Sequence, residues 1–399
     1  MRFNLWEDCN RVPLTELLSF VVDNRGKTVP TAPSGHKLIA TNCVTNNALF
    51  PVYEKIRYLS EETYQTWFRA HPIPGDILFV NKGTPGRVCL VPDPVDFCIA
   101  QDMIALRADE SKIYPKYLFA VLRSREIQQQ IYNTNVGDVI PHFKKQFLDQ
   151  LLIPIPERSI QESIGDLYYV LSLKAERNKK INDNLYEMVN AYYTSLFKES
   201  DCEMTTVGNY AERIYSGGTP MTSNAAYWNG TFGWFSSGET RNRFVISTEK
   251  TITQAGIDNS STKLATKYDI VMASAGQGFT RGQTSMLLID TYVNQSVIVI
   301  KSERNILPYL FWNLVNRYDE LRAISDSSSI RGSLTTKMIA AFEIPLANEQ
   351  SLQAFADFAW SVIPQIENNL LENERLTALR DLLLPKLMSG EIDVTDIQL

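Results

Sequence analysis

The feature that most constrains this chain is an internal duplication, because one order of features appears twice at an offset of about 190 to 195 residues. The repeated unit is half of the 399-residue protein, which is far longer than the period of a solenoid repeat. Each half opens with a glycine turn, at residues 25–30 and 216–220, and closes with Ile-Pro, at 153–154 and 344–345. We therefore expect two modules of one fold.

Between these ends, each half contains an acid-marked turn, a short β-rich run and a glycine loop. The matching segments are 75–80 with 268–273, 82–87 with 275–282, and 100–102 with 294–296. This alignment predicts that Arg87 and Arg281 lie at equivalent places beside the glycines.

Both modules are followed by about forty residues with few glycines or prolines, in which apolar residues recur at spacings of three and four. Even the polar interruption repeats, with Asn178 and Asn369 separated by 191 positions. The pattern predicts two long helices, each the other's partner, although two separate surface helices are an alternative. The expected seam residues are Leu167, Leu171, Asn178, Leu185 and Met188 in the first helix and Phe358, Val362, Asn369, Leu376 and Leu379 in the second.

The predicted fold class is α+β, with two similar β-rich domains separated by two long helices that form an intramolecular antiparallel coiled coil with pseudo-two-fold symmetry. The expected divisions are 1–157 for the first domain, 158–198 for the first helix, 199–347 for the second domain, 348–390 for the second helix and 391–399 for the tail.

Composition and charge narrow the class of protein. The net charge of −6 means that any site for a polyanion must be a local patch. Five cysteines without a C-x-x-C pair and three dispersed histidines argue against a disulfide framework and against a metal site. No apolar run is long enough to span a bilayer, and the first residues lack the order of a signal peptide, so we expect a cytoplasmic protein with no membrane partner.

Three segments point to a known family. These are Ser-Gly-Gly-Thr-Pro at 216–220, Tyr-Trp-Asn-Gly at 227–230 and the end Leu-Pro-Lys-Leu-Met-Ser-Gly-Glu-Ile at 384–392. With the module-helix-module-helix order, the chain resembles the specificity subunit of Type I restriction-modification enzymes. The first module departs from this pattern, because it has Arg-Gly-Lys-Thr-Val-Pro at 25–30 and no Tyr-Trp-x-Gly segment.

The resemblance implies a non-catalytic subunit. Each module would be a target-recognition domain that reads one half of a split sequence in double-stranded DNA. The helices would set the gap and dock methyltransferase (modification) subunits, two of which are expected. S-adenosylmethionine, ATP and Mg²⁺ would be used by those subunits and by the restriction/translocase subunits, and this chain would hold no cofactor.

Sequence motifs agree with a chain that has no chemistry of its own. There is no Asn/Asp-Pro-Pro-Tyr/Phe turn for holding a flipped base and no Walker A motif. The glycines at 276, 278 and 282 depart from the spacing of a dinucleotide loop. Two alternatives remain open: a coiled-coil scaffold whose two modules bind proteins, and an enzyme with an unrecognised active site.

DNA contacts are expected from loops, where Lys and Arg can reach phosphates and Arg or Gln can reach base edges. The candidates are Lys27, Lys82, Arg87, Lys144 and Lys145 in the first module and Arg241, Arg243, Gln277, Arg281 and Arg331 in the second. An arginine beside a turn is also commonly a solvated or ion-paired surface residue. Aromatic residues at 227–235 could stack on bases, but core packing is the more frequent role of such a cluster.

Overall fold

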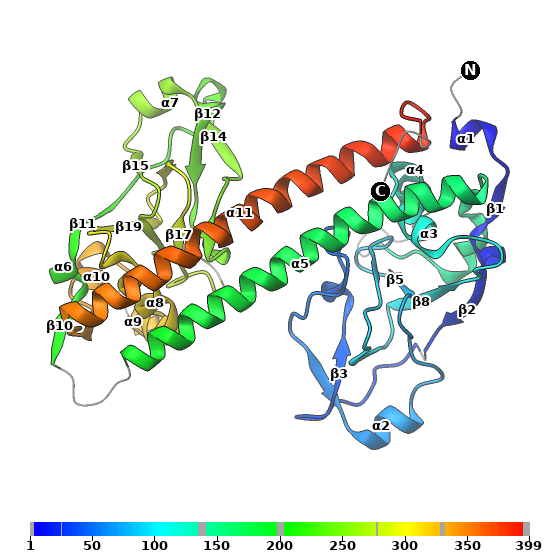
Figure 1. Cartoon of the computed structure of the whole chain (residues 1–399), viewed down its shortest axis with the longest axis horizontal. Coiled ribbons are helices and arrows are strands. Elements are labelled where there is room, and N and C mark those ends of the chain that lie inside the picture. Colours follow the sequence, from blue (N-terminus) through cyan, green and yellow to red (C-terminus); the bar gives the residue numbers. More distant parts are fainter. Residues whose placement is uncertain are drawn as a thin grey trace. The chain divides into compact units, whose positions relative to one another are not determined.

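Two long helices, α5 (Arg158–Leu196) and α11 (Glu349–Met388), each follow a β-rich module (Figure 1). The structure, a computed structural model, describes residues 4–24, 26–134, 141–197, 203–276, 278–327 and 332–393. The chain divides into two compact units. The first combines Met1–Asn178 with Glu372–Leu399, and the second is Lys179–Leu371. Each unit thus contains one module and a stretch of both helices.

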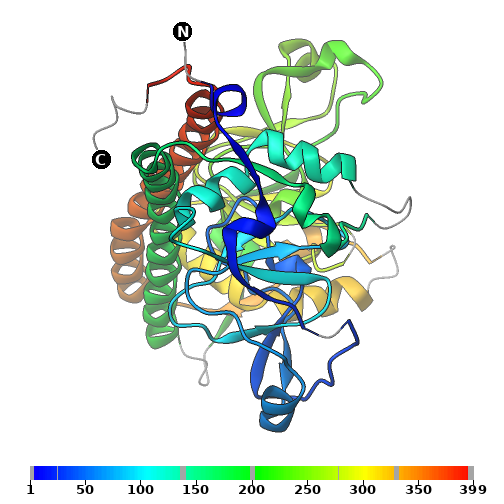
Figure 2. The ribbon, with the colours of Figure 1, turned by 90° about the vertical axis from the view of Figure 1, so that its right-hand side faces the viewer.

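The first module is built on a four-stranded sheet of order β2-β8-β5-β6, with a three-stranded sheet of order β4-β3-β7 and an antiparallel pair of β1 and β9. Most of this module is drawn in blue to cyan in Figure 2. The strands are β1 (Arg11–Pro13), β2 (Leu18–Val22), β3 (His36–Ile39), β4 (Arg57–Leu59), β5 (Ile77–Val80), β6 (Val88–Leu90), β7 (Phe97–Ile99), β8 (Met103–Ala108) and β9 (Leu152–Pro154). The helices are α1 (Leu5–Asp8), α2 (Glu61–Thr66), α3 (Pro115–Leu122) and α4 (Arg125–Thr134), with short 3₁₀ turns η1 (Leu14–Leu17), η2 (Thr41–Cys43) and η3 (Lys145–Gln150).

The second module repeats this plan with a five-stranded sheet of order β11-β19-β16-β17-β13, a four-stranded sheet of order β14-β12-β18-β15 and a pair of β10 and β20. The strands are β10 (Met204–Thr206), β11 (Ala211–Ser216), β12 (Trp228–Phe235), β13 (Phe244–Val245), β14 (Lys250–Ile252), β15 (Lys263–Ala265), β16 (Ile270–Ala273), β17 (Thr284–Leu287), β18 (Thr291–Val293), β19 (Val297–Ser302) and β20 (Glu343–Pro345). The helices are α6 (Val207–Tyr210), α7 (Gln254–Asp258), α8 (Leu307–Asn316), α9 (Tyr318–Ser327) and α10 (Thr336–Ala340), with η4 (Ala225–Tyr227) and η5 (Ser237–Arg241).

The central strand of each main sheet is buried on both faces, which explains its continuous apolar run. Because successive side chains of a strand point to opposite faces, β5 places Ile77 and Phe79 in the core beneath α3 and Leu78 in a second core between the two sheets. In β16, Met272 and Val271 divide between two cores in the same way.

Equivalent hydrogen bonds confirm the duplication. The N–H of Asn81 donates to the carbonyl of Asp102 at 2.8 Å, and the N–H of Ser274 donates to that of Ser296 at 2.9 Å. The hydroxyl of Tyr117 donates to the Pro154 carbonyl at 2.9 Å, as that of Tyr309 does to Pro345 at 2.5 Å. The closing Ile-Pro segments are therefore the strands on which a buried tyrosine anchors each module.

The two long helices pack against each other within each unit, running antiparallel. In the first unit Ile164 and Leu171 lie with Leu384 and Leu387, and in the second Tyr192 packs on Phe358. A side chain at Gly165 would meet the backbone nitrogen of Tyr117 at 2.6 Å, so glycine lets α5 approach α3 closely.

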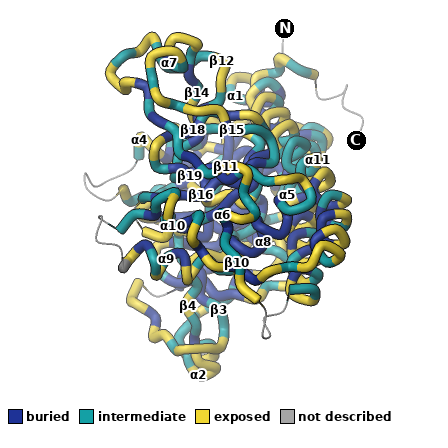
Figure 3. Tube along the Cα trace, turned by 90° about the vertical axis from the view of Figure 1, so that its left-hand side faces the viewer, coloured by how far each residue is buried: buried dark blue, intermediate teal, exposed yellow. Residues whose placement is uncertain are grey.

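The seam prediction is right in part. Asn178 and Val362 are buried, and the seam positions Leu167, Leu171, Leu185, Phe358, Asn369 and Leu376 are half-buried. The placement of Met188 and Leu379 in the seam is wrong, because these residues are 46% and 44% exposed. Figure 3 shows buried, intermediate and exposed stretches alternating along α5 and α11.

The physical reason for this difference is a second packing surface. Within each unit α5 covers the module as well as α11, so its buried face includes Tyr168 against Phe119 in the first unit and Tyr186 stacked on Trp312 in the second. Beyond Asn178 the buried positions move by one residue from the predicted heptad, and Val189 rather than Met188 is buried.

Candidate nucleic-acid interface

The acid-marked turn before each glycine loop is structural. Asp76 accepts from the N–H of Ile73 and forms an ion pair with Arg107 at 2.9 Å. Asp269 accepts from the N–H of Thr266 and pairs with Lys301 at 3.2 Å. The ion pair raises the pKa of Arg107, whereas burial raises the pKa of Asp269 despite its hydrogen bonds. These carboxyl groups fix the start of β5 and β16. Their hydrogen bonds and ion pairs indicate a structural role and not a catalytic one.

In the first module, the glycine loop lies beside the segment at 141–145. Gly83 donates to the carbonyl of Pro141 at 3.0 Å, and Lys82 forms a backbone bridge with His142. Three candidates, Lys82, Lys144 and Lys145, are therefore brought together from positions about sixty residues apart in the sequence.

The first-module candidates differ in how they are held. Lys145 forms an ion pair with Asp23, which ties the segment to the end of β2. Lys27, Lys82, Arg87 and Lys144 are exposed, and none of them forms an ion pair with another described residue. Because these cations form no ion pair with a described residue, they can neutralise DNA phosphates without breaking such a pair first.

In the second module, helix α9 holds the glycine loop. Arg281 pairs with Asp326 at 2.7 Å and donates to the carbonyl of Gly332, and Arg322 donates to the carbonyl of Gly278 at 2.5 Å. Arg281 is half-buried, so part of its hydrogen-bonding capacity is used in shaping the loop. Gln277 and Arg331 lie outside the described residues.

Two further candidates sit on the approach to β13. Arg241, exposed at the end of η5, pairs with Glu249. The Arg243 guanidinium lies over the ring of Tyr186, 4.1 Å from its centroid. The hydroxyl of Ser285 donates to the Thr240 carbonyl at 3.2 Å, so η5 lies next to the strand that follows the glycine loop.

The predicted equivalence of Arg87 and Arg281 is wrong. Gly86 donates to the carbonyl of Val80 and Gly282 to that of Ala273, which makes these two glycines the matching pair; both have positive φ, 87° and 84°. The carbonyl of Arg87 accepts from Val80, and its counterpart accepting from Ala273 is Gln283. The second loop has more residues between its strand and its glycine, and the loops therefore present different side chains on one scaffold.

The aromatic cluster is partly core. Trp234 and Phe235 are buried, Tyr227 and Trp228 are half-buried, and Phe232 is 38% exposed. Both indole N–H groups donate to the entry turn: that of Trp228 to the Met221 carbonyl and that of Trp234 to the Gly218 carbonyl, at 3.2 and 3.3 Å. The Gly-Gly-Thr-Pro and Tyr-Trp-Asn-Gly segments thus form one structural unit.

Phe279 was missed as a candidate. It stands in the glycine loop with 73% of its surface exposed, and Tyr318 donates to its carbonyl. The sequence feature that could have identified it is an aromatic residue between glycines, because an exposed ring can stack on or wedge between bases. Arg322 had no local signal, because its partner in the loop is 44 residues away.

Other kinds of site are absent from the part of the chain described here. No group of three or more His, Cys, Asp or Glu residues there could hold a metal ion, and four cysteines within it are free thiols. No helix in those ranges is both long and apolar enough to cross a membrane.

Comparison with known proteins identifies the family. The model of the family described as Type I restriction modification DNA specificity domain matches this chain twice, over residues 21–186 and 199–374. The chain belongs to this family. It is a Type I DNA specificity protein with two specificity domains that recognise a DNA target.

This specificity protein is similar in sequence to specificity subunits of known Type I restriction enzymes. It is 21% identical to the specificity subunit of the Type I restriction enzyme HindI from Haemophilus influenzae, over 80% of this chain and 86% of that one. It is 27% identical to the EcoR124I/EcoR124II specificity subunit from Escherichia coli, over 54% and 57%. The fold matches the crystal structure of a Type I S subunit from M. genitalium with a TM-score of 0.62 at 18% identity, over 97% and 98% of the two chains. The resemblance drawn from the sequence is confirmed.

Proposed function

We propose that this chain is the non-catalytic specificity subunit of a Type I restriction-modification complex, in which each module reads one half of a bipartite target in double-stranded DNA. The observation that carries the proposal is one hydrogen-bonded scaffold built twice with different residues on its two glycine loops. Two related folds with different loop side chains suit two different half-site sequences, because base edges are read by side chains and not by the scaffold.

Helices α5 and α11 set the gap between the half-sites and dock the methyltransferase subunits. Their 39 and 40 residues correspond to about 60 Å of helix at about 1.5 Å per residue. That length exceeds one turn of B-DNA, about 34 Å. Two similar helical stretches, one in each unit, favour two copies of the methyltransferase.

Chemistry belongs to the partner subunits. Methyl transfer from S-adenosylmethionine and ATP- and Mg²⁺-dependent translocation and cleavage need motifs that this sequence lacks. This chain therefore needs no cofactor of its own, and its contribution is to position the partners on the target.

The test is selection from random-sequence DNA by the chain together with its purified methyltransferase subunit. We expect a split motif with a fixed gap. Recovery of unsplit or unrelated sequences would overturn the proposal. Affinity measured at rising salt separates DNA reading from protein scaffolding, because several phosphate contacts make log affinity fall steeply with log salt.

A further inference from the structure

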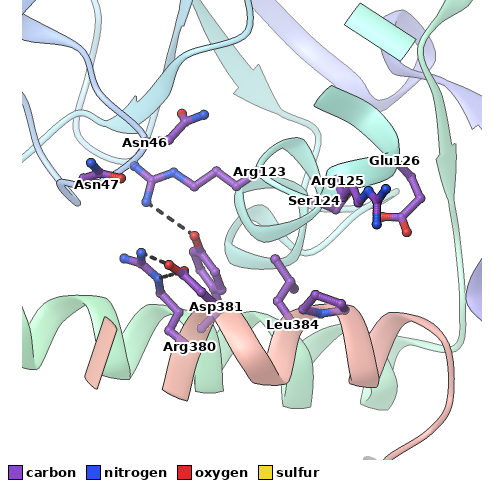
Figure 4. Close-up of a pocket in the computed structure, with 11 residues that line it drawn as sticks. Asn46, Asn47, Arg123, Ser124, Arg125, Glu126, Arg380, Asp381 and Leu384 are labelled. Carbon is purple, nitrogen blue, oxygen red and sulfur yellow. Dashed lines mark hydrogen bonds and ion pairs between the residues drawn. The ribbon is translucent and has the colours of Figure 1, made fainter. Parts of the chain in front are cut away.

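A pocket of about 290 Å³ in the first unit contains two buried arginines (Figure 4). Arg123 follows α3 and Arg380 belongs to α11, and the two residues are 9% and 5% exposed. The ring of Tyr168 links them: its hydroxyl accepts from Arg123 at 3.5 Å, and the Arg380 guanidinium lies 5.4 Å from its centroid.

The hydrogen bonds of the Arg123 guanidinium are incomplete. Arg123 donates to the carbonyls of Ala48 and Val88 at 2.5 and 2.8 Å, but its buried Nε has no partner among the described residues. Arg380 pairs with Asp381, a neighbour on the same helix whose side chain is 58% exposed. An unused donor on a buried cation is costly unless a ligand completes it.

The pocket has an excess of one positive charge. Its lining holds three arginines, Arg123, Arg125 and Arg380, against two carboxylates, Glu126 and Asp381. A single carboxylate balances this charge, whereas the closely spaced phosphates of a DNA strand carry more negative charge than the pocket can balance.

The second unit provides an internal comparison. Tyr117 corresponds to Tyr309, so Arg123 corresponds to Val315; Tyr168 and Arg380 correspond to Ala359 and Val189 by the 191-residue offset of the helices. Ala359 and Val189 are fully buried in an apolar core. The same junction of module and helices is therefore stable without charge, and packing alone does not require the two arginines.

We propose that this pocket binds a carboxylate, the side chain of an Asp or Glu residue on a protein subunit that docks against the first unit. The inference rests on the proposed function, in which methyltransferase subunits dock on the helices. Because Arg123, Tyr168 and Arg380 have apolar counterparts in the second unit, the contact distinguishes two otherwise similar docking positions.

The experiment compares Arg380→Met with the matched control Arg375→Met, an exposed arginine on the same helix. Affinity of the full chain for its purified methyltransferase subunit is measured by calorimetry, and affinity for DNA by filter binding. We expect Arg380→Met to weaken subunit binding about 10-fold or more, as expected for loss of a buried charge-assisted contact, with about twofold or less for the control. Arg380→Lys, which keeps the charge but not the fork of donors, should fall between them.

Melting temperature and DNA affinity complete the test. We expect both to be unchanged in Arg380→Met. A lower melting temperature with unchanged subunit affinity would make Arg380 a packing residue and overturn the inference. An equal loss of DNA affinity would make the ligand a phosphate and overturn it as well. If the unsubstituted chain fails to bind the subunit, the proposed function itself fails, and the assignment of the ligand falls with it.

Discussion

The side-chain amide of Asn178 donates to the side-chain oxygen of Asn373 at 3.0 Å. An equivalent bond runs from Asn369 to Asn182 at 2.8 Å in the other unit. In both cases the accepting asparagine donates in turn to a backbone carbonyl of the facing helix at 3.1 Å. Slippage of either helix would leave these amides unpaired, so the asparagines define the register at some cost in stability.

The asparagine pair should be energetically coupled. Asn178→Ala leaves Asn373 without its donor and is expected to lower the free energy of unfolding by about 1 to 3 kcal/mol. A double-mutant cycle of Asn178→Ala with Asn373→Ala, measured by urea unfolding, should give a coupling of about 0.5 to 3 kcal/mol. Asn184→Ala, at an exposed position of α5, should change little. Additive effects would show that the bond does not hold the helices in register.

Neighbouring residues of α5 test the corrected seam. Val189 is fully buried and Met188 is 46% exposed. Val189→Ala should destabilise the chain by about 2 kcal/mol or more, since two buried methyl groups are lost and a cavity remains. Met188→Ala should cost less than about 1 kcal/mol. If Met188→Ala lowered the denaturant midpoint more than Val189→Ala, the seam would follow the heptad predicted from the sequence.

The first module should lose stability as the pH falls below neutrality. Burial lowers the pKa of His71, and the nearby charge of His36 acts in the same direction against a hydrogen bond to the Tyr64 backbone. The unfolded chain, with a histidine pKa of about 6.5, then binds the proton more tightly than the folded one. The contribution of His71 is complete above that value and is lost as the pH falls through the lower folded pKa.

Substitution separates this histidine from other titrating groups. His71 stacks on Tyr64 with ring centroids 4.3 Å apart, a contact that phenylalanine can preserve. His71→Phe should therefore flatten the dependence of melting temperature on pH between about 7 and 5. An unchanged slope would assign the effect to other groups.

Lys144 should contribute to DNA affinity through contact with phosphates. Lys144 is exposed without an ion pair to a described residue, so Lys144→Gln should weaken binding to all sequences and reduce the slope of log affinity against log salt by about 1. Lys179→Gln, on α5, provides the control. If both variants keep the slope of the unsubstituted chain, the cluster at 141–145 does not contact phosphates.

Local and repeated patterns were readable from the sequence. The duplication, the long helices and the family follow from features that repeat at a constant offset, such as Asn178 with Asn369, or that depend on neighbours a few residues apart. The glycine loops were also predicted, because glycine is needed where φ is positive, as at Gly86 and Gly282.

Tertiary structure alone decided which surfaces meet. Val189 is buried in place of Met188 because α5 covers a module as well as another helix, and Gln283 matches Arg87 because strand hydrogen bonds, not loop lengths, set the equivalence. Arg123 and Arg380 face one pocket although 257 positions separate them in the sequence. Burial and charge pairing depend on everything that packs around a residue, and residues distant in the chain leave no local pattern from which to predict it.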